Sequence, residues 1–158
     1  MDDYRFELAR VADAGRLAAM SARLVEAGLV PAWGRERIRS HVLHPESVVL
    51  TARRDAAIAG FAIMRYADTQ AHLNLLAVDP SHRRRGVGRR LVRWLEETAL
   101  TAGTFVIGLE LREGNTAARA FYAGLGYREL ARVCGYYQGV ETAIRMQRDV
   151  RPTETRAP

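Results

Sequence analysis

The stretch that decides the fold lies in the middle of the chain, where residues 75–88 read Leu-Leu-Ala-Val-Asp-Pro-Ser-His-Arg-Arg-Arg-Gly-Val-Gly. Its apolar start predicts a strand that ends at Asp79-Pro80, and its end opens an amphipathic helix. Gly86 and Gly88 allow backbone N–H groups to come close to an anion. The helix N-terminus adds about half a positive charge, and the arginines add paired donors. The stretch therefore predicts a site for a pyrophosphate group.

Two other phosphate-binding motifs are excluded. A dinucleotide fingerprint needs a third glycine where this chain has Leu91, and a P-loop needs a lysine after its glycine. None of the 158 residues is a lysine, so all 24 basic side chains are arginines. The same absence excludes a Schiff-base nucleophile and a lysine general base.

The net charge of +6 is concentrated beside the same stretch. The first 82 residues carry ten arginines against ten acidic side chains, and the remainder carries fourteen against eight. Six arginines lie between Arg83 and Arg93 with no acid among them. Clustered arginine is also typical of nucleic-acid binding, but Glu96 and Glu97 follow closely and no aromatic side chains interleave to stack bases. We therefore expect no nucleic-acid partner.

Outward from this stretch, the hydrophobic pattern alternates between strands and helices. Period-two or β-rich segments predict strands over residues 6–10, 47–53, 57–66, 72–78, 104–112, 127–134 and 143–148. Helical spacing and capping residues predict helices after Asp13, over 33–43, from Gly88 to Gly103, and over 115–125. This order predicts one mixed α/β domain over residues 1–150 and a polar tail at 151–158.

Two of these elements carry specific expectations about side-chain direction. In the strand over 104–112, Phe105, Ile107, Leu109 and Leu111 share one face, so Glu110 should point away from the packed leucines. In the helix after Gly88, the polar side should carry Arg89, Arg93, Glu96 and Glu97.

Cysteine usage and hydropathy bear on the compartment. Cys134 is the only cysteine, which excludes an internal disulfide and fits a reducing compartment; we expect a small buried side chain there. The acidic start, Met-Asp-Asp-Tyr, is unlike a signal peptide, and the longest apolar run, residues 56–64, is too short to span a bilayer. We expect a cytoplasmic protein with no membrane partner.

The histidines do not form a ligand set. His41 and His44 could share a helix face, but no third ligand accompanies them, so we expect no metal. His72 and His82 are scattered and are assigned no role.

Two motifs resemble those of the GNAT superfamily of acetyl-CoA-dependent acetyltransferases. Residues 83–88 match its pattern of Arg or Gln, two residues, Gly, one residue, and Gly or Ala, and residues 75–80 are typical of its central strand. Residues 115–122 and 125–127 match its second pattern, an Asn, a helix with a Tyr, and Gly-Phe or Gly-Tyr. The resemblance implies a central mixed twisted sheet flanked by helices, with acetyl-CoA as co-substrate.

Within that superfamily the chain is most similar to the ribosomal-protein alanine N-acetyltransferases, over about residues 70–148. Residues 109–112, Leu-Glu-Leu-Arg, resemble their Leu-Glu-Val-Arg, and residues 135–146 resemble their closing hairpin. The hairpin departs from the family where Gln138 replaces a proline and Glu141-Thr142 replaces Glu-Asp. These departures bear on the acceptor, which the first seventy residues shape in this superfamily.

The resemblance also implies roles for individual residues. It makes Glu110 the general base, directly or through water, and Tyr122 the acid that protonates the leaving thiolate. The residues that would hold acetyl-CoA are Leu76, Ala77 and Val78 along the pantetheine arm, Arg83, Arg84, Arg85, Gly86, Val87, Gly88 and Arg89 at the pyrophosphate, and Asn115 on the opposite side. Tyr136 and Tyr137 fall where acceptor contacts are expected, although aromatic packing in the hairpin explains them equally well.

The chemistry of the acceptor favours an α-amine. An N-terminal amine titrates about 2.5 pH units below a lysine side chain, so a single carboxylate base could present it in neutral form. The alternatives are a small amine, such as a polyamine, amino acid or antibiotic, and a catalytically silent acyl-CoA sensor. The protein is expected to be a monomer or a homodimer.

Overall fold

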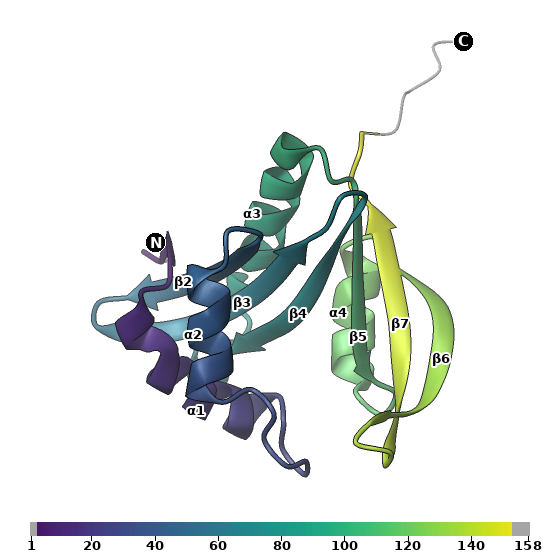
Figure 1. Cartoon of the computed structure of the whole chain (residues 1–158), viewed down its shortest axis with the longest axis horizontal. Coiled ribbons are helices and arrows are strands. Elements are labelled where there is room, and N and C mark those ends of the chain that lie inside the picture. The colour runs from purple at the N-terminus through teal and green to yellow at the C-terminus, as the bar shows by residue number, and fades with distance from the viewer. Residues whose placement is uncertain (1–2, 153–158) are drawn as a thin grey trace.

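The computed structural model describes residues 3–152 and contains a seven-stranded sheet with α-helices on both sides (Figure 1). The strands are β1 (Arg5–Leu8), β2 (Ser47–Arg54), β3 (Ala57–Tyr66), β4 (Gln70–Val78), β5 (Val106–Arg112), β6 (Arg128–Tyr137) and β7 (Glu141–Asp149). The helices are α1 (Ala14–Leu24), α2 (Arg35–Leu43), α3 (Val87–Ala102) and α4 (Thr116–Gly124), with 3-10 turns at Val11–Asp13 and Pro80–His82. The strand order is β1-β2-β3-β4-β5-β7-β6, and only the β4–β5 pair is parallel.

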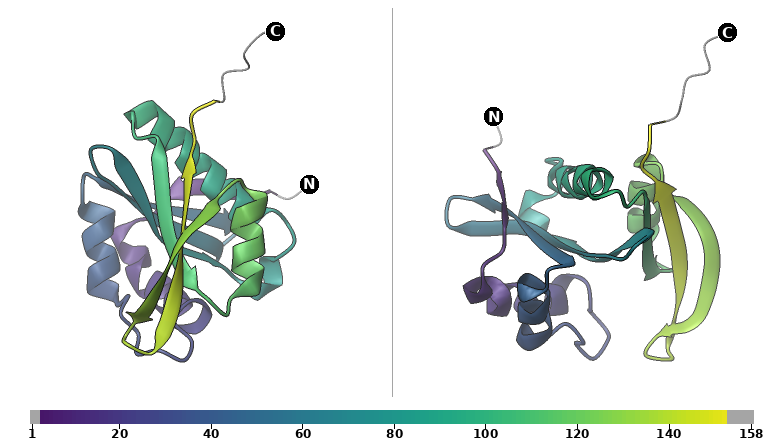
Figure 2. Two further views of the ribbon diagram at one scale, coloured as in Figure 1. Left: turned by 90° about the vertical axis from the view of Figure 1, so that its right-hand side faces the viewer. Right: turned by 45° about the horizontal axis from the view of Figure 1, so that its top comes forward.

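Helices cover both faces of the sheet, α3 and α4 on one and α1 and α2 on the other (Figure 2). The apolar side of α3, including Leu91 and Leu95, is buried with α4 in one core. Leu17 of α1 and Ile38 of α2 are buried in a second core on the opposite face. A mixed sheet flanked by helices confirms the predicted fold class. None of the helices within residues 3–152 is long and apolar enough to cross a membrane.

Several strand ends differ from the prediction, among them the end of β1, which stops at Leu8 and not at residue 10. β5 begins at Val106, so Phe105 lies before the strand. β6 continues to Tyr137, three residues beyond the predicted end at Cys134. The expectation that Cys134 is buried was wrong: β6 is an edge strand, most of its residues are exposed, and Cys134 is exposed with them.

Glu96 was also placed wrongly, because it is buried rather than on the polar side of α3. Its carboxylate accepts hydrogen bonds from Arg93 at 2.5 Å, Arg148 at 2.5 Å and the Tyr127 hydroxyl at 3.1 Å. Burial of a charge is tolerated where it is paired in this way, and partners distant in sequence leave no periodic signal.

Asp13 stands just before α1, as predicted, but does not cap it with its side chain. The carboxylate accepts hydrogen bonds from the Arg10 backbone N–H at 2.7 Å and from Arg53 at 2.5 Å. Arg53 also forms an ion pair with Glu7 at 3.0 Å, which ties β1 and β2 to the start of α1.

A β-bulge at Asn74 reverses which face of the sheet the side chains of β4 meet. Leu75 pairs with Ile63 of β3, but Leu73 pairs with the adjacent Met64, so Asn74 is the extra residue. Before the bulge, Leu73 is buried in the α3 core; after it, Leu75 is buried in the α1 core. An extra residue in one strand shifts the alternation of side chains by one position. Because Leu73 faces α3, its neighbour His72 faces the side of α1 and α2.

The parallel strands β4 and β5 pair only at their beginnings. Their register runs through Gln70–Val106 and Ala71–Ile107 and ends at His72–Gly108. Beyond this point the two strands diverge, and the edge of β4 that faces β5 is open from Leu73 onward. Binding sites of α/β sheets commonly lie where neighbouring strands part.

Candidate active site

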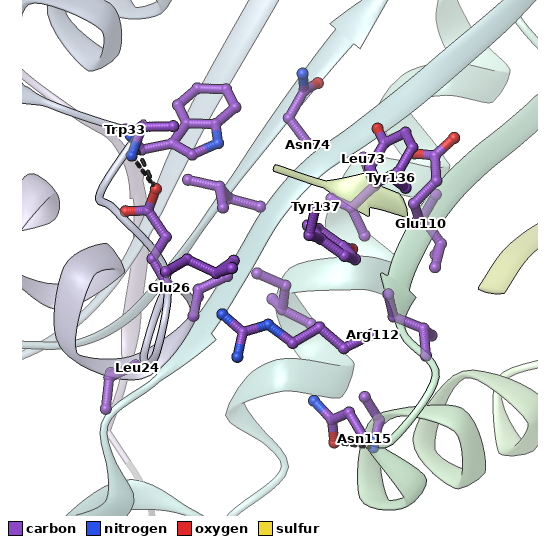
Figure 3. A pocket seen from close by; sticks show the side chains of 18 of the residues that line it. Leu24, Glu26, Trp33, Leu73, Asn74, Glu110, Arg112, Asn115, Tyr136 and Tyr137 are labelled. Atoms are coloured by element: carbon purple, nitrogen blue, oxygen red, sulfur yellow. Dashed lines mark hydrogen bonds between the residues drawn. The ribbon is translucent and has the colours of Figure 1, made fainter. Parts of the chain in front are cut away.

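A cavity of about 420 Å³ lies where β4 and β5 diverge (Figure 3). One wall comes from the segment between α1 and α2, including Glu26 and Trp33, and another from the β6–β7 hairpin, including Tyr136 and Tyr137. The strands themselves contribute a third group of lining residues, His72, Asn74, Glu110 and Arg112. Tyr122, Asn115 and Ala118 line the side formed by α4. The cavity thus brings together the two residues predicted for acid–base chemistry.

Glu110 lies in this cavity and points away from the buried leucines of β5, as the alternation predicted. One carboxylate oxygen is hydrogen-bonded to His72 Nε2, and the other accepts from Arg145 Nε at 3.1 Å. Burial raises the pKa of Glu110, but the hydrogen bonds and charges of His72 and Arg145 outweigh it and hold the pKa below its usual range. Glu110 is therefore an ionised carboxylate with both oxygens engaged.

His72 is a site residue that the sequence reasoning missed. The hydrogen bond with Glu110 raises the pKa of His72, and this outweighs the opposite effect of burial. The face of β4 on which His72 lies depends on its position relative to the bulge at Asn74, two residues further along the strand. Neither the bulge nor the pairing of β4 with β5 can be read from the sequence, so the contact with Glu110 could not be predicted.

Tyr122 is buried in α4 while lining the same cavity as Glu110. Its ring contacts Tyr127 edge-on, with ring centroids 5.5 Å apart, and contacts Phe121 in the same way at 5.0 Å. Burial raises the pKa of Tyr122 above its usual range, and a charge on nearby Tyr137 would raise it further. The phenol is thus held protonated at neutral pH.

The arginine-glycine turn joins β4 to α3 as predicted, with the helix starting at Val87 rather than Gly88. Gly86 caps α3 with φ of 74°, and Arg84 has φ of 62°, both in the left-handed region. Arg83, Arg84, Arg85 and Arg89 are exposed around this turn. The first N–H groups of a helix have no partner within it, so donors and positive charge meet here.

The other residues expected to hold the coenzyme lie on two sides of the diverging strands. Leu76, Ala77 and Val78 pair with β3 on one side only, and the opposite edge of β4 is open toward β5. Asn115 caps α4 by accepting a hydrogen bond from the Ala118 N–H at 3.0 Å, which confirms its predicted place before the helix. Asn115 also lines the cavity.

The segment between α1 and α2 is held by Glu26, which sequence reasoning did not single out. Its buried carboxylate accepts hydrogen bonds from the backbone of Ala32 at 2.5 Å and Trp33 at 3.0 Å, and from Ser21 at 3.0 Å (Figure 3). The sequence carries no signal for this role, because two of the partners of Glu26 are backbone N–H groups in an irregular segment. The hydrogen bonds fix Trp33 in the wall of the cavity.

Two contacts join this segment to the strands beyond the cavity. Arg112 donates to the Ala27 carbonyl at 2.5 Å, while its Nη2 is buried with no hydrogen-bond partner among residues 3–152. Gln138 donates to the Val30 carbonyl at 2.6 Å and accepts from the Val30 N–H at 3.1 Å. The first contact joins the segment to β5, and the second joins it to the β6–β7 hairpin.

Residues 3–152 contain no group of three His, Cys, Asp or Glu side chains placed to hold a metal ion. His41 is hydrogen-bonded to Ser47 at 2.9 Å, and His44 contacts Arg65 at 3.3 Å. The two histidines therefore have separate partners in the structure.

Comparison with known proteins agrees with this geometry. The model of the Acetyltransferase (GNAT) family matches residues 20–127. The "[Ribosomal protein bS18]-alanine N-acetyltransferase" of Salmonella typhimurium is 41% identical over 95 residues, which span 58% of this chain and 64% of that relative. The "N-alpha-acetyltransferase RimI" of Mycobacterium tuberculosis is 33% identical over 144 residues, 87% of each chain. The crystal structure of the ribosomal-protein-S18-alanine N-acetyltransferase from Escherichia coli superposes with a TM-score of 0.81 at 25% identity, covering 98% of this chain and 99% of that one. This chain belongs to the Acetyltransferase (GNAT) family.

Proposed function

We propose that the protein transfers an acetyl group from acetyl-CoA to the α-amine of a protein N-terminus. The observation that carries this proposal is the divergence of β4 and β5 after the His72–Gly108 pair, with Glu110 and Tyr122 lining the cavity that it opens. An acid–base pair beside an open strand edge suits the transfer of an acyl group from an extended thioester arm. The names of the Salmonella and M. tuberculosis relatives support the same reaction.

In this proposal the coenzyme lies across the C-terminal half of β4. The exposed arginines and the first turn of α3 bind its pyrophosphate, because both supply donors and positive charge. The pantetheine arm pairs with the open edge of Leu76, Ala77 and Val78 in the manner of an added strand. A backbone N–H near Val78 then stabilises the negative charge that develops on the thioester oxygen.

The proposed acceptor enters from the side of Trp33 and the β6–β7 hairpin. An α-amine needs less driving force for deprotonation than a lysine amine at neutral pH, because its pKa is about 2.5 units lower. The two loops that are joined by Gln138 and Val30 narrow the partly open cavity on that side. Such a site favours a chain terminus over a side chain within a folded segment.

The reaction needs one proton removed from the amine and one given to the thiolate, and Glu110 and Tyr122 line the cavity where both transfers would occur. The proton of the amine passes to the Glu110 carboxylate, directly or through a group hydrogen-bonded to it. The amine nitrogen attacks the carbonyl carbon, the new C–N bond forms, and the C–S bond breaks. The thiolate then receives a proton from the Tyr122 hydroxyl, which the raised pKa keeps protonated until this step.

An acceptor panel with acetyl-CoA tests the proposal. Peptides with free N-termini, the same peptides with blocked N-termini and one internal lysine, spermidine and an aminoglycoside would be compared by release of free coenzyme A. We expect turnover with free N-termini and no turnover with blocked ones. Turnover confined to the small amines would replace the proposed acceptor, and coenzyme binding without turnover would indicate a sensor.

Variants test the assigned side chains in the same assay. We expect Glu110→Gln and Tyr122→Phe each to lower kcat by about 10²-fold, with little change in the KM for acetyl-CoA. Glu113→Gln is the matched control, because Glu113 lies just beyond β5 and pairs with exposed Arg132 at 2.6 Å. Wild-type kcat in both site variants would exclude the roles proposed for them.

A further inference from the structure

We propose that His72 is the group that takes the proton from the acceptor amine, and that Glu110 is a positioning residue that acts through it. This inference rests on the proposed acetyl transfer and adds a residue to it. It follows from the placement of three side chains across β4, β5 and β7. The motifs of the chain gave no role to His72.

The pairing of the strands puts the His72 ring against Glu110. His72 is the last residue of β4 to pair with β5, and its partner is Gly108. A Cβ at Gly108 would meet only the Met146 carbonyl oxygen, at 3.9 Å, so this face of β5 is uncrowded. Glu110 is two residues further along β5 and therefore faces the same side as Gly108. The carboxylate meets the ring at Nε2.

Both oxygens of the Glu110 carboxylate already have hydrogen-bond partners. Besides the contact with His72, its second oxygen accepts a hydrogen bond from Arg145, its cross-strand neighbour on β7. The side chain of Glu110 is only 10% exposed, whereas that of His72 is 42% exposed. His72 lines both the main cavity and a second hollow with Arg65, Gln70 and Arg145. An incoming amine can therefore reach the imidazole more easily than the carboxylate.

In this arrangement the Glu110 carboxylate orients the ring of His72, as a carboxylate orients a histidine base in other enzymes. When Glu110 is ionised and His72 is neutral, the hydrogen bond places the ring proton on Nε2 and leaves the lone pair of Nδ1 as the base. As the amine nitrogen attacks the thioester carbon, its proton passes to Nδ1. The imidazolium is stabilised by the carboxylate, and the thiolate takes the proton of Tyr122. Reprotonation of Tyr122 and deprotonation of His72 through solvent return the site to its starting state.

The charged and titratable groups around His72 set its pH range. Arg65 of β3 is its cross-strand neighbour, Glu110 faces it from β5, and Arg145 lies beyond the carboxylate on β7. Tyr136 of β6 also lies near Glu110; burial raises the pKa of that phenol, and the charge of Glu110 raises it further. Glu110 and Asn74 raise the pKa of His72, whereas burial and Arg145 lower it, and the net shift is upward. A histidine base in this range suits an acceptor α-amine, whose own pKa is about 8.

Chemical rescue separates a base from a structural side chain. We expect His72→Ala to lower kcat by about 10²-fold or more, to leave the KM for acetyl-CoA within about twofold, and to regain activity when imidazole is added. The rescued rate should depend on the pKa of substituted imidazoles, because the added base replaces Nδ1. His44→Ala, which removes a histidine at the end of α2, is the matched control and should show wild-type kcat with no effect of imidazole.

A second variant and a second readout distinguish the other outcomes. Glu110→Gln should lower kcat without rescue by imidazole, and in ¹⁵N NMR it should lower the pKa of His72 and reduce the Nε2–H tautomer that dominates in the wild type at high pH. Wild-type kcat in His72→Ala, with Glu110→Gln inactive, would overturn the role of His72 and leave the proposed function intact. A slow His72→Ala that imidazole does not rescue would also overturn it. No turnover by the wild type on any acceptor would instead remove the proposed function, and this assignment with it.

Discussion

Gln138 and Val30 are 108 positions apart in the chain, yet the side-chain amide of Gln138 is hydrogen-bonded to both the N–H and the carbonyl of Val30. This contact connects the β6–β7 turn to the segment between α1 and α2. Because it joins two walls of the proposed acceptor cavity, we predict that Gln138→Ala raises the KM for an acceptor peptide about fivefold and leaves the KM for acetyl-CoA unchanged. Steady-state kinetics with each substrate varied in turn would measure both constants.

Val140→Ala is the control for that variant, because Val140 lies in the same turn and is 78% exposed. It should leave both KM values unchanged. An equal rise in the acceptor KM for both variants would show that the turn matters but that the Gln138 contact does not.

The buried carboxylate of Glu96 predicts a large effect on stability. Glu96→Ala removes the carboxylate that the half-buried Arg93 and Arg148 share, so we expect the free energy of unfolding to fall by about 2–3 kcal/mol in urea denaturation. Tyr127→Phe removes one hydrogen bond to the same carboxylate and should lower it by about 1 kcal/mol. Glu97→Ala, on the exposed neighbour, should stay within about 0.5 kcal/mol of wild type. Equal effects at positions 96 and 97 would contradict this account.

The left-handed conformation of Gly86 predicts a selective effect on coenzyme binding. A side chain at φ of 74° is strained by about 1–2 kcal/mol, even though a Cβ there would meet no atom within 4 Å. We expect Gly86→Ala to shift the turn before α3 and to raise the KM for acetyl-CoA about tenfold, with the acceptor KM unchanged. Gly15→Ala in α1 also has open space but no positive φ, so it should be neutral or slightly stabilising. A wild-type acetyl-CoA KM in Gly86→Ala would remove this turn from the proposed coenzyme site.

The Asp13–Arg53 ion pair predicts a dependence of stability on acid. Burial raises the pKa of Asp13, but the Arg10 N–H and Arg53 outweigh it, so the pKa is lower in the folded protein than in the unfolded chain. The resulting stabilisation is present above the unfolded pKa, about 3.9, and is lost as pH falls through the folded value. Asp13→Asn should therefore lower the free energy of unfolding by about 3 kcal/mol at pH 7. The difference from wild type should shrink below pH 4, and a difference that is constant from pH 7 to pH 3 would contradict the prediction.

The sequence predicted the elements well where local chemistry decides them. The arginine-glycine turn, the alternation that turns Glu110 away from the buried leucines of β5, and the cap at Asn115 depend on neighbouring residues, and the structure has all three. The burial of Glu96, the exposure of Cys134 and the contact between His72 and Glu110 depend on partners or layers distant in sequence. No period of 2 or 3.6 residues records such partners. This is why the helix and strand pattern was predicted while the contact between His72 and Glu110 was not.

The bulge at Asn74 makes the length of β4 part of the chemistry. With one residue fewer, β3 and β4 would pair without interruption, and the His72 side chain would turn toward α3 and away from Glu110. The sheet and its helices could survive such a deletion with every motif intact, yet the proposed base would lie on the wrong side of the sheet. In a related chain, the spacing between the histidine and the arginine-glycine turn is therefore as informative about catalysis as the identity of either.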